Sequence, residues 1–255
     1  MRSCIVLGSG RSGTSMAAGL FRNSGYFMGD RPMPVRTANP RGFFEDLDVN
    51  EINEALLARV VKPRRGGVLA LLPGMRSRPA FAQRWLAEVP LSVRCDSTPQ
   101  LRTQIRDLVA RSPYCLKDPR FCYTLPAWRP LLDDPVYLCV FRDPARTAES
   151  IVREAREAEY LRGLQLDRDR ALRVWELMYG HVLQHHRHVG DWLFVHYDQV
   201  LDNSAVDVIE QVVGAPLDRT FPDQRVSRSR TGRSVPDSVA KVYAQLLELS
   251  RSSLG

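Results

Sequence analysis

The sequence predicts an α/β fold in which a central parallel sheet is flanked by helices on both faces. Short apolar runs alternate with amphipathic segments, and a glycine-rich turn joins the first run to the first amphipathic segment. The run Pro135–Phe141 is apolar throughout, as a central parallel strand should be. With 255 residues, 44% of them hydrophobic, the chain can bury one sizeable core, and no linker rich in proline, glycine or serine divides it. We therefore expect a single domain over residues 1–255.

The first predicted strand, Cys4–Leu7, leads into the glycine-rich stretch Gly8–Ser15, and a helix is expected over residues 16–21. The glycines permit a left-handed backbone, while successive N–H groups and the helix N-terminus direct partial positive charge into one concavity. Such a turn is typical of a phosphate site. Its spacing matches the nucleotide-binding pattern G-x-x-x-x-G-K-[ST], except that Thr14 occupies the lysine position. The fixed cation is instead Arg11, inside the loop.

Several elements are expected between this loop and the middle of the chain. They are a short strand over Gly25–Gly29, a long loop over Asp30–Gly42, a helix that carries Ile52 and Leu56 and is capped near Asp48 or Asn50, a helix over Phe81–Val89, and a helix that begins at Pro99. Glu45 and Asp46 lie close to the start of the first of these helices. The simplest interpretation of this acidic pair is charge complementarity to the helix N-terminus, which requires no catalysis.

Two predicted strands end in polar clusters. The buried strand Tyr114–Leu116 is followed by Lys117-Asp118-Pro119-Arg120, and the strand Pro135–Phe141 is followed by Arg142-Asp143-Pro144. Ser150 lies eight residues beyond Arg142, two turns into the next helix, so both side chains could approach one phosphate. In open α/β sheets, ligands bind at the carboxyl ends of the strands. The alternative interpretation of the first cluster is an ion pair that is satisfied within its own turn.

The last third of the chain continues the alternation. The expected elements are an amphipathic helix over Asp167–His188, a strand over Trp192–Val195, a helix over Val206–Val213, a basic segment over Arg225–Arg233, and a final helix that carries Val239 and Leu249. His181, His185 and His188 recur with helical spacing on one face of the first of these helices. For them a solvated polar face near a helix C-terminus is favoured over a metal site.

The composition narrows the classes of partner. The net charge is +7, and lysine occurs only at Lys62, Lys117 and Lys241, so nearly all of the positive charge is arginine, whose planar fork suits phosphate and sulfate. Basic residues are interspersed with acids along the helices, which argues against nucleic acid as the ligand. No basic leader precedes the first apolar run, and no stretch reaches the ~20 apolar residues of a membrane span. Five cysteines, an odd number, are expected to be small buried side chains in a soluble, cytoplasmic protein.

Two motifs carry a resemblance to a known family. The pattern R-S-G-T-S directly after the first strand resembles the 5′-phosphosulfate loop of the P-loop sulfotransferases, which use 3′-phosphoadenosine 5′-phosphosulfate (PAPS). The pattern F-R-D-P with Ser150 looks like the 3′-phosphate site of the same enzymes. The stretch V-H-Y-D-Q-V-L-D-N near residue 200, and Lys117–Arg120 with Pro126 and Trp128, resemble further segments of the bacterial members.

The resemblance implies a P-loop-type parallel sheet and a metal-independent, in-line transfer of a sulfuryl group from PAPS to an acceptor hydroxyl. It implies that Ser12, Gly13, Thr14 and Ser15 hold the 5′-phosphate, that Arg11 stabilises charge on the bridging oxygen, and that Arg142 and Ser150 bind the 3′-phosphate. Glu45 is the first candidate for the general base, and Asp118, with Lys117 beside it, is the second. The acceptor, a small molecule or a carbohydrate, and the oligomeric state stay open.

Two rival functions share the same loop. A P-loop small-molecule kinase would use the cradle for a nucleoside triphosphate, but Thr14 at the lysine position and Arg142 at the end of a central strand both argue against it. A nucleotide-binding or nucleic-acid-binding module without catalysis is the other alternative. In sulfotransferases a basic loop near the C-terminus covers the 3′-phosphate, and the segment Arg225–Arg233 is either that loop or a solvated basic turn.

Overall fold

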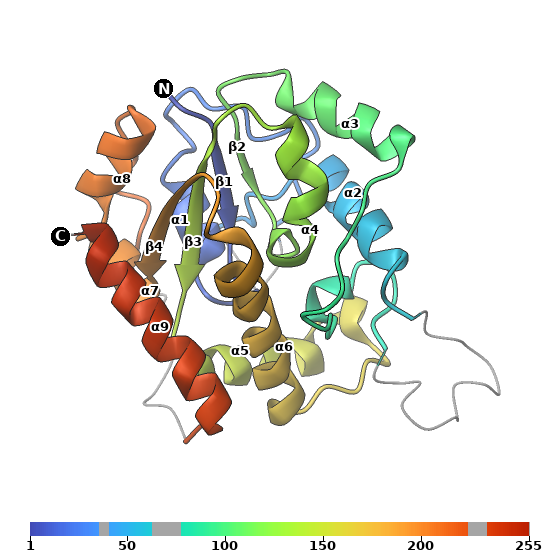
Figure 1. Ribbon diagram of the computed structural model, residues 1–255. Coiled ribbons are helices and arrows are strands. Elements are labelled where there is room, and N and C mark those ends of the chain that lie inside the picture. Colours follow the sequence, from blue (N-terminus) through green and yellow to red (C-terminus); the bar gives the residue numbers. More distant parts are fainter. Residues whose placement is uncertain (36–40, 63–77, 224–233, 255) are drawn as a thin grey trace.

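The computed structural model describes residues 1–35, 41–62, 78–223 and 234–254. In these ranges four strands form one sheet in the order β2-β1-β3-β4, and every neighbouring pair is parallel. The strands are β1 (Cys4–Leu7), β2 (Cys115–Lys117), β3 (Val136–Phe141) and β4 (Asp191–His196). The predicted α/β class with a central parallel sheet flanked by helices is therefore confirmed (Figure 1).

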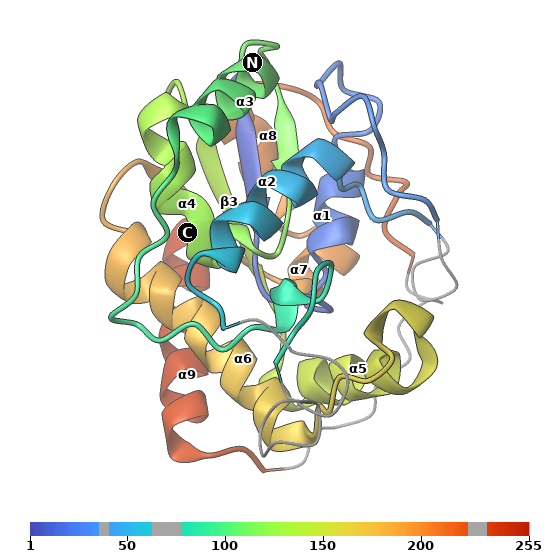
Figure 2. The ribbon, with the colours of Figure 1, turned by 90° about the vertical axis from the view of Figure 1, so that its right-hand side faces the viewer.

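Helices cover both faces of this sheet because its strands are apolar on both sides. The helices of the described residues are α1 (Thr14–Gly19), α2 (Leu47–Ala58), α3 (Pro99–Val109), α4 (Phe121–Trp128), α5 (Pro144–Glu157), α6 (Arg168–His181), α7 (Tyr197–Leu201), α8 (Val206–Val213) and α9 (Asp237–Leu254). Alternate residues of β1 enter different core clusters: Ile5 and Leu7 pack with α2, α4 and α6, whereas Cys4 and Val6 pack with α1 and α8. Figure 2 shows α2 and α4 at one end of the former layer and α5 and α6 at the other.

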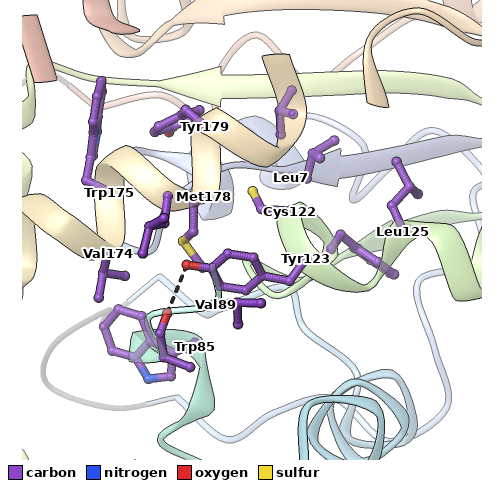
Figure 3. Packing of buried hydrophobic residues seen from close by; sticks show 14 of the residues in the cluster. Leu7, Trp85, Val89, Cys122, Tyr123, Leu125, Val174, Trp175, Met178 and Tyr179 are labelled. Carbon is purple, nitrogen blue, oxygen red and sulfur yellow. Dashed lines mark hydrogen bonds between the residues drawn. The ribbon is translucent and has the colours of Figure 1, made fainter. Parts of the chain in front are cut away.

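The larger core cluster also fixes the loop after β1. Trp175, Tyr179 and Tyr123 are almost fully buried, and Figure 3 shows them with Leu7 and Met178. The Tyr179 hydroxyl accepts a hydrogen bond from Ser9 N at 3.0 Å and donates one to Val140 O at 2.7 Å. One buried side chain thus holds the start of the β1–α1 loop against the end of β3. All five cysteines are buried and free, as the sequence predicted.

Three local expectations were wrong. Residues 25–29 do not form a strand: only Phe27 pairs, in a single bridge to Tyr114, because Gly25 and Gly29 both adopt positive φ and end the extended run. The helix expected over Phe81–Val89 is reduced to the 3₁₀ turn Arg84–Leu86, since Ala82 has positive φ and Pro90 disfavours a helical residue before it. The cap of α2 is Asp46 rather than Asp48 or Asn50, and its carboxylate accepts from Asp48 N and Val49 N.

The histidine face of α6 was also predicted incorrectly. The helix ends at His181 and continues as the π-helical turn Val182–His186. His181 is buried rather than solvated, because the segment that precedes α3 packs over it and Val89 O lies 3.1 Å from its Nε2. His188 is exposed, whereas His186, which the sequence pattern left out, lies in the core with Nε2 3.1 Å from Cys122 O. In the described ranges, no helix combines the length and apolar character that crossing a membrane requires.

Candidate functional site

A cavity of about 440 Å³ lies at the carboxyl ends of β1, β2 and β3. Its lining comes from the β1–α1 loop, the start of α2, the short segment around Trp85, the residues after β2 and β3, and α5. The volume is within the range of pockets that hold cofactor-sized ligands. Segments far apart in the sequence meet here because the carboxyl ends of parallel strands lie at one edge of a sheet.

The β1–α1 loop needs its glycines for packing as well as for backbone conformation. Gly8 and Gly13 have φ values of 143° and 96°. A Cβ atom on Gly10 would lie 2.3 Å from Trp85 Cζ3, and one on Gly13 would lie 2.5 Å from Tyr197 Cδ2. The loop is therefore held between two aromatic rings that approach its backbone directly. Arg11, with φ of 69°, is the residue in this loop that takes a left-handed conformation with a side chain.

Arg11 connects this loop to α5. Its Nε donates to Ser150 Oγ at 3.1 Å and forms an ion pair with Glu154 Oε2 at 3.2 Å. The other carboxylate oxygen of Glu154 accepts a hydrogen bond from the Tyr160 hydroxyl at 2.7 Å. The serine expected at a 3′-phosphate site and the arginine expected at a 5′-phosphate site are thus in direct contact.

Arg142 follows β3 and lies over the ring of Tyr197, with Cζ 4.0 Å from the ring centroid. The residue is 7% exposed, and burial lowers the pKa of its guanidinium from the ordinary value. An arginine nevertheless stays protonated at physiological pH. Tyr197 begins α7, where a reciprocal capping box of His196 and Gln199 fixes the helix start and hence the position of the ring.

Glu45 also lines the cavity, just before α2. Its Oε1 is 2.5 Å from Lys117 Nζ, and its Oε2 accepts from Asn50 Nδ2 at 3.1 Å. Asn50 Nδ2 also donates to Asp118 Oδ2 at 2.9 Å. The amide NH₂ of Asn50 therefore donates to two carboxylates. Ionised carboxylates only accept hydrogen bonds, so the amide nitrogen, and not the amide oxygen, is assigned to this side.

Beyond Asp118 the network continues through Arg120 and Glu54, which also line the cavity. Arg120 Nη1 is 3.1 Å from Asp118 Oδ1, and Arg120 Nε is 2.8 Å from Glu54 Oε1. Glu54 Oε2 is in turn 2.6 Å from Arg84 Nη1. Burial raises the pKa of Asp118, and the adjacent Arg120 guanidinium opposes that shift. Charges this deep are tolerated only when each is paired and hydrogen-bonded, which this alternating chain provides.

Most of the residues predicted from the sequence meet at the cavity. The residues that line it are Arg11, Gly13, Thr14, Ser15, Glu45, Lys117, Arg142 and Ser150. Ser12 and Asp118 are fully buried behind the lining. The segment Arg225–Arg233 lies outside the described residues.

Sequence reasoning missed several lining residues. They are Asn50, Glu54, Trp85, Glu154 and Tyr197. Tyr197 stands inside the stretch V-H-Y-D-Q-V-L-D-N, so that motif contained a usable signal. The others lie on segments whose periodicity only predicted amphipathic helices, and nothing local marks them as site residues.

Among the described residues, no group of three or more histidine, cysteine or acidic side chains is arranged to hold a metal ion. The arrangement offers guanidinium and hydroxyl donors on one side and a carboxylate held by a lysine and an amide on the other. No family model, curated protein or solved structure matches this chain.

Proposed function

We propose that this protein is a PAPS-dependent sulfotransferase of the P-loop type. The observation that supports the proposal is the convergence of two sets of anion-binding donors on one cavity. Arg11 comes from the loop after β1, and Thr14 and Ser15 come from the start of α1. Arg142 and Ser150 come from the end of β3 and from α5. Because β1 and β3 are neighbours, one ligand with two anionic ends can reach both sets.

The residues present fit such a ligand chemically. Guanidinium groups and hydroxyls are the donors that phosphate and sulfate oxygens accept from most strongly, and the contact between Arg11 and Ser150 makes the two sets continuous. The aromatic rings of Trp85 and Tyr197 enclose the loop backbone and limit the access of water. When bound, PAPS supplies the sulfuryl group that is transferred.

Glu45 is the side chain proposed to take the proton from the acceptor hydroxyl. Its carboxylate is 8% exposed, faces the cavity and is fixed by Lys117 and Asn50. Each carboxylate oxygen has two lone pairs, so these contacts leave capacity to accept one more hydrogen bond. A base held in one orientation within reach of the substrate is what proton transfer requires. Asp118 is the weaker candidate, because it is fully buried and does not line the cavity.

The experiment that tests the proposal compares two nucleotides by titration calorimetry. Adenosine 3′,5′-bisphosphate should bind at least tenfold more tightly than ADP, because Arg142 and Ser150 are proposed to contact the 3′-phosphate. Arg142→Ala should weaken the bisphosphate by about 1.5–3 kcal/mol, the value of a charge-assisted hydrogen bond. Arg153→Ala is the matched control, since it removes the same charge from an exposed position of α5.

Equal affinity for the two nucleotides would overturn the proposal. Turnover that is abolished by EDTA and restored by magnesium would instead favour the rival assignment, a P-loop small-molecule kinase.

A further inference from the structure

The acceptor side of the cavity, here called the second wall, is formed by the lining residues at position 33 and within 41–54, 81–85 and 117–120. It includes the Glu45 carboxylate. If the proposed function holds, this wall contacts the acceptor, because the proposed nucleotide donors Arg11, Arg142 and Ser150 come from other segments of the lining. Its chemistry therefore bears on which acceptor is used.

Among the residues that the structure describes, every charged side chain that lines the second wall is paired within the protein. The pairs are Glu45 with Lys117 at 2.5 Å, Glu51 with Arg31 at 3.1 Å, Glu54 with Arg120 at 2.8 Å and with Arg84 at 2.6 Å, and Arg41 with Asp223 at 3.7 Å. A charged acceptor beside the buried pairs would compete with a partner that is already in place, and displacing that partner would leave an uncompensated charge. The charges of these pairs are thus neutralised within the protein.

The polar groups of this wall are also engaged with one another. Asn50 donates to both Glu45 and Asp118. Arg120 donates to Asp118 and Glu54. Recognition of a free sugar depends on side-chain amides, carboxylates and guanidinium groups that bind several hydroxyls at once. The second wall has such groups, but their hydrogen bonds hold the wall itself together.

The remaining surface of the second wall is apolar. In the described ranges its large side chains are Met33, Phe43, Leu47, Phe81 and Trp85. Four of these five are at least partly buried, whereas Phe81 is 65% exposed. A large exposed aromatic ring that also lines a cavity is a position where an apolar ligand gains contact area.

We infer that the acceptor is a neutral compound whose hydroxyl is attached to an apolar, aromatic or alkyl, body. The apolar body lies against Phe81 and its neighbours, and the hydroxyl reaches the Glu45 carboxylate. This inference rests on the proposed function for the role of the hydroxyl, but the apolar binding itself does not depend on it. We therefore expect a free sugar and a phosphorylated acceptor to bind this wall more weakly than such a compound.

The test measures binding of three probes, 2-naphthol, glucose and glucose 6-phosphate, to the full chain with and without saturating adenosine 3′,5′-bisphosphate. We expect 2-naphthol to bind at least tenfold more tightly than either sugar. Phe81→Ala should weaken 2-naphthol about fivefold to tenfold, because it removes apolar contact area, and should leave bisphosphate affinity unchanged. Val189→Ala shortens another exposed apolar side chain, 54% exposed, that does not line the cavity and serves as the control.

Tighter binding of glucose or glucose 6-phosphate than of 2-naphthol, or a Phe81→Ala variant with unaltered 2-naphthol affinity, would overturn the inference. A different result would contradict the proposed function alone. In that result adenosine 3′,5′-bisphosphate does not bind, whereas 2-naphthol binds to the unmodified protein and more weakly to Phe81→Ala. Because Phe81 is largely exposed, its replacement should not unfold the protein, and a urea titration checks this.

Discussion

Two strands that lie on either side of β1 end in almost the same three residues, which have different roles. β2 ends at Lys117, which Asp118-Pro119 follows, and β3 is followed by Arg142-Asp143-Pro144. Both tripeptides place a cation and a carboxylate at the carboxyl edge of a parallel sheet, and each leads into a helix, α4 from Phe121 and α5 from Pro144. Their surroundings, however, give the two carboxylates and the two cations different roles.

After β2, the charged side chains pair with one another in a single network. Asp118 is fully buried and receives hydrogen bonds from Arg120 and Asn50, and Lys117 pairs with Glu45. The partners Glu45 and Asn50 come from the start of α2, nearly seventy positions away in the sequence. This region therefore acts as a rigid support whose charges are already neutralised.

After β3 the aspartate caps a helix and the cation faces an aromatic ring. Asp143 Oδ1 accepts from Arg146 N at 2.8 Å, with Pro144 in the first turn of α5. Arg142 lies over Tyr197 and lines the cavity. The comparison shows that a charged tripeptide at a strand end does not define its own function. The segment that packs against it decides whether its cation pairs with buried carboxylates or lines the cavity.

The largest expected effect tests whether the network after β2 serves a catalytic carboxylate. Glu45→Gln should lower turnover with PAPS and 2-naphthol by roughly 10²–10⁴, because the amide cannot accept the hydroxyl proton, while affinity for adenosine 3′,5′-bisphosphate stays nearly unchanged. Glu51→Gln is the control, since Glu51 also lines the cavity but pairs with Arg31. Normal turnover in Glu45→Gln would assign Glu45 a purely structural role beside Lys117.

The same substitution at the two aspartates tests the comparison directly. Asp118→Asn removes the charge opposite the buried Arg120 and should lower the free energy of unfolding by about 3 kcal/mol. Asp143→Asn keeps an oxygen that can accept from Arg146 N, and asparagine caps helices as well as aspartate does, so its cost should stay below about 0.5 kcal/mol. Urea titrations at pH 7 measure both values. Equal losses at the two sites would contradict the distinction between network and cap.

The sequence was sufficient to predict the sheet and the edge at which the site lies. β3 is apolar at every position, and the glycine-rich loop after β1 lines the cavity at the predicted edge, so local patterns were informative there. It was not sufficient to predict Asn50 and Glu54, because polar residues on an amphipathic helix are normally expected to face solvent. Both are buried here, since their partners Asp118 and Arg120 come from a strand end that is remote in the sequence.

A third prediction concerns the pH dependence of stability, which we expect to depend on a buried histidine beside the helix that follows β2. α4, after β2, is contacted by the buried His186, whose pKa burial lowers to about 3. The unfolded chain binds this proton near pH 6.5, whereas the folded protein does not until about pH 3. The free energy of unfolding should therefore fall as the pH decreases below 6.5, by about 1.4 kcal/mol per pH unit for this residue, or about 2 kcal/mol by pH 5.

His186→Gln removes the titrating group, so urea titrations between pH 7 and pH 5 should give a shallower slope than for the unmodified protein. The slope is the quantity to compare, because the substitution also alters core packing. His188→Gln, at an exposed position, should keep the original slope. If His186→Gln has the same slope as the unmodified protein, proton binding by His186 does not contribute to acid sensitivity.

The smallest expected effect concerns the ring of Tyr197, which contacts Arg142. Lys117 pairs with a carboxylate instead. Tyr197→Leu removes the aromatic face 4.0 Å from the guanidinium carbon and should weaken binding of adenosine 3′,5′-bisphosphate by about 0.5–1 kcal/mol, which is twofold to fivefold. Tyr197→Phe keeps the ring, both over Arg142 and against the Gly13 backbone, and should bind the nucleotide as the unmodified protein does. Titration calorimetry of both variants gives the comparison. Equal weakening in the two would assign the effect to the hydroxyl, and no weakening in Tyr197→Leu would mean that Arg142 is oriented without the ring.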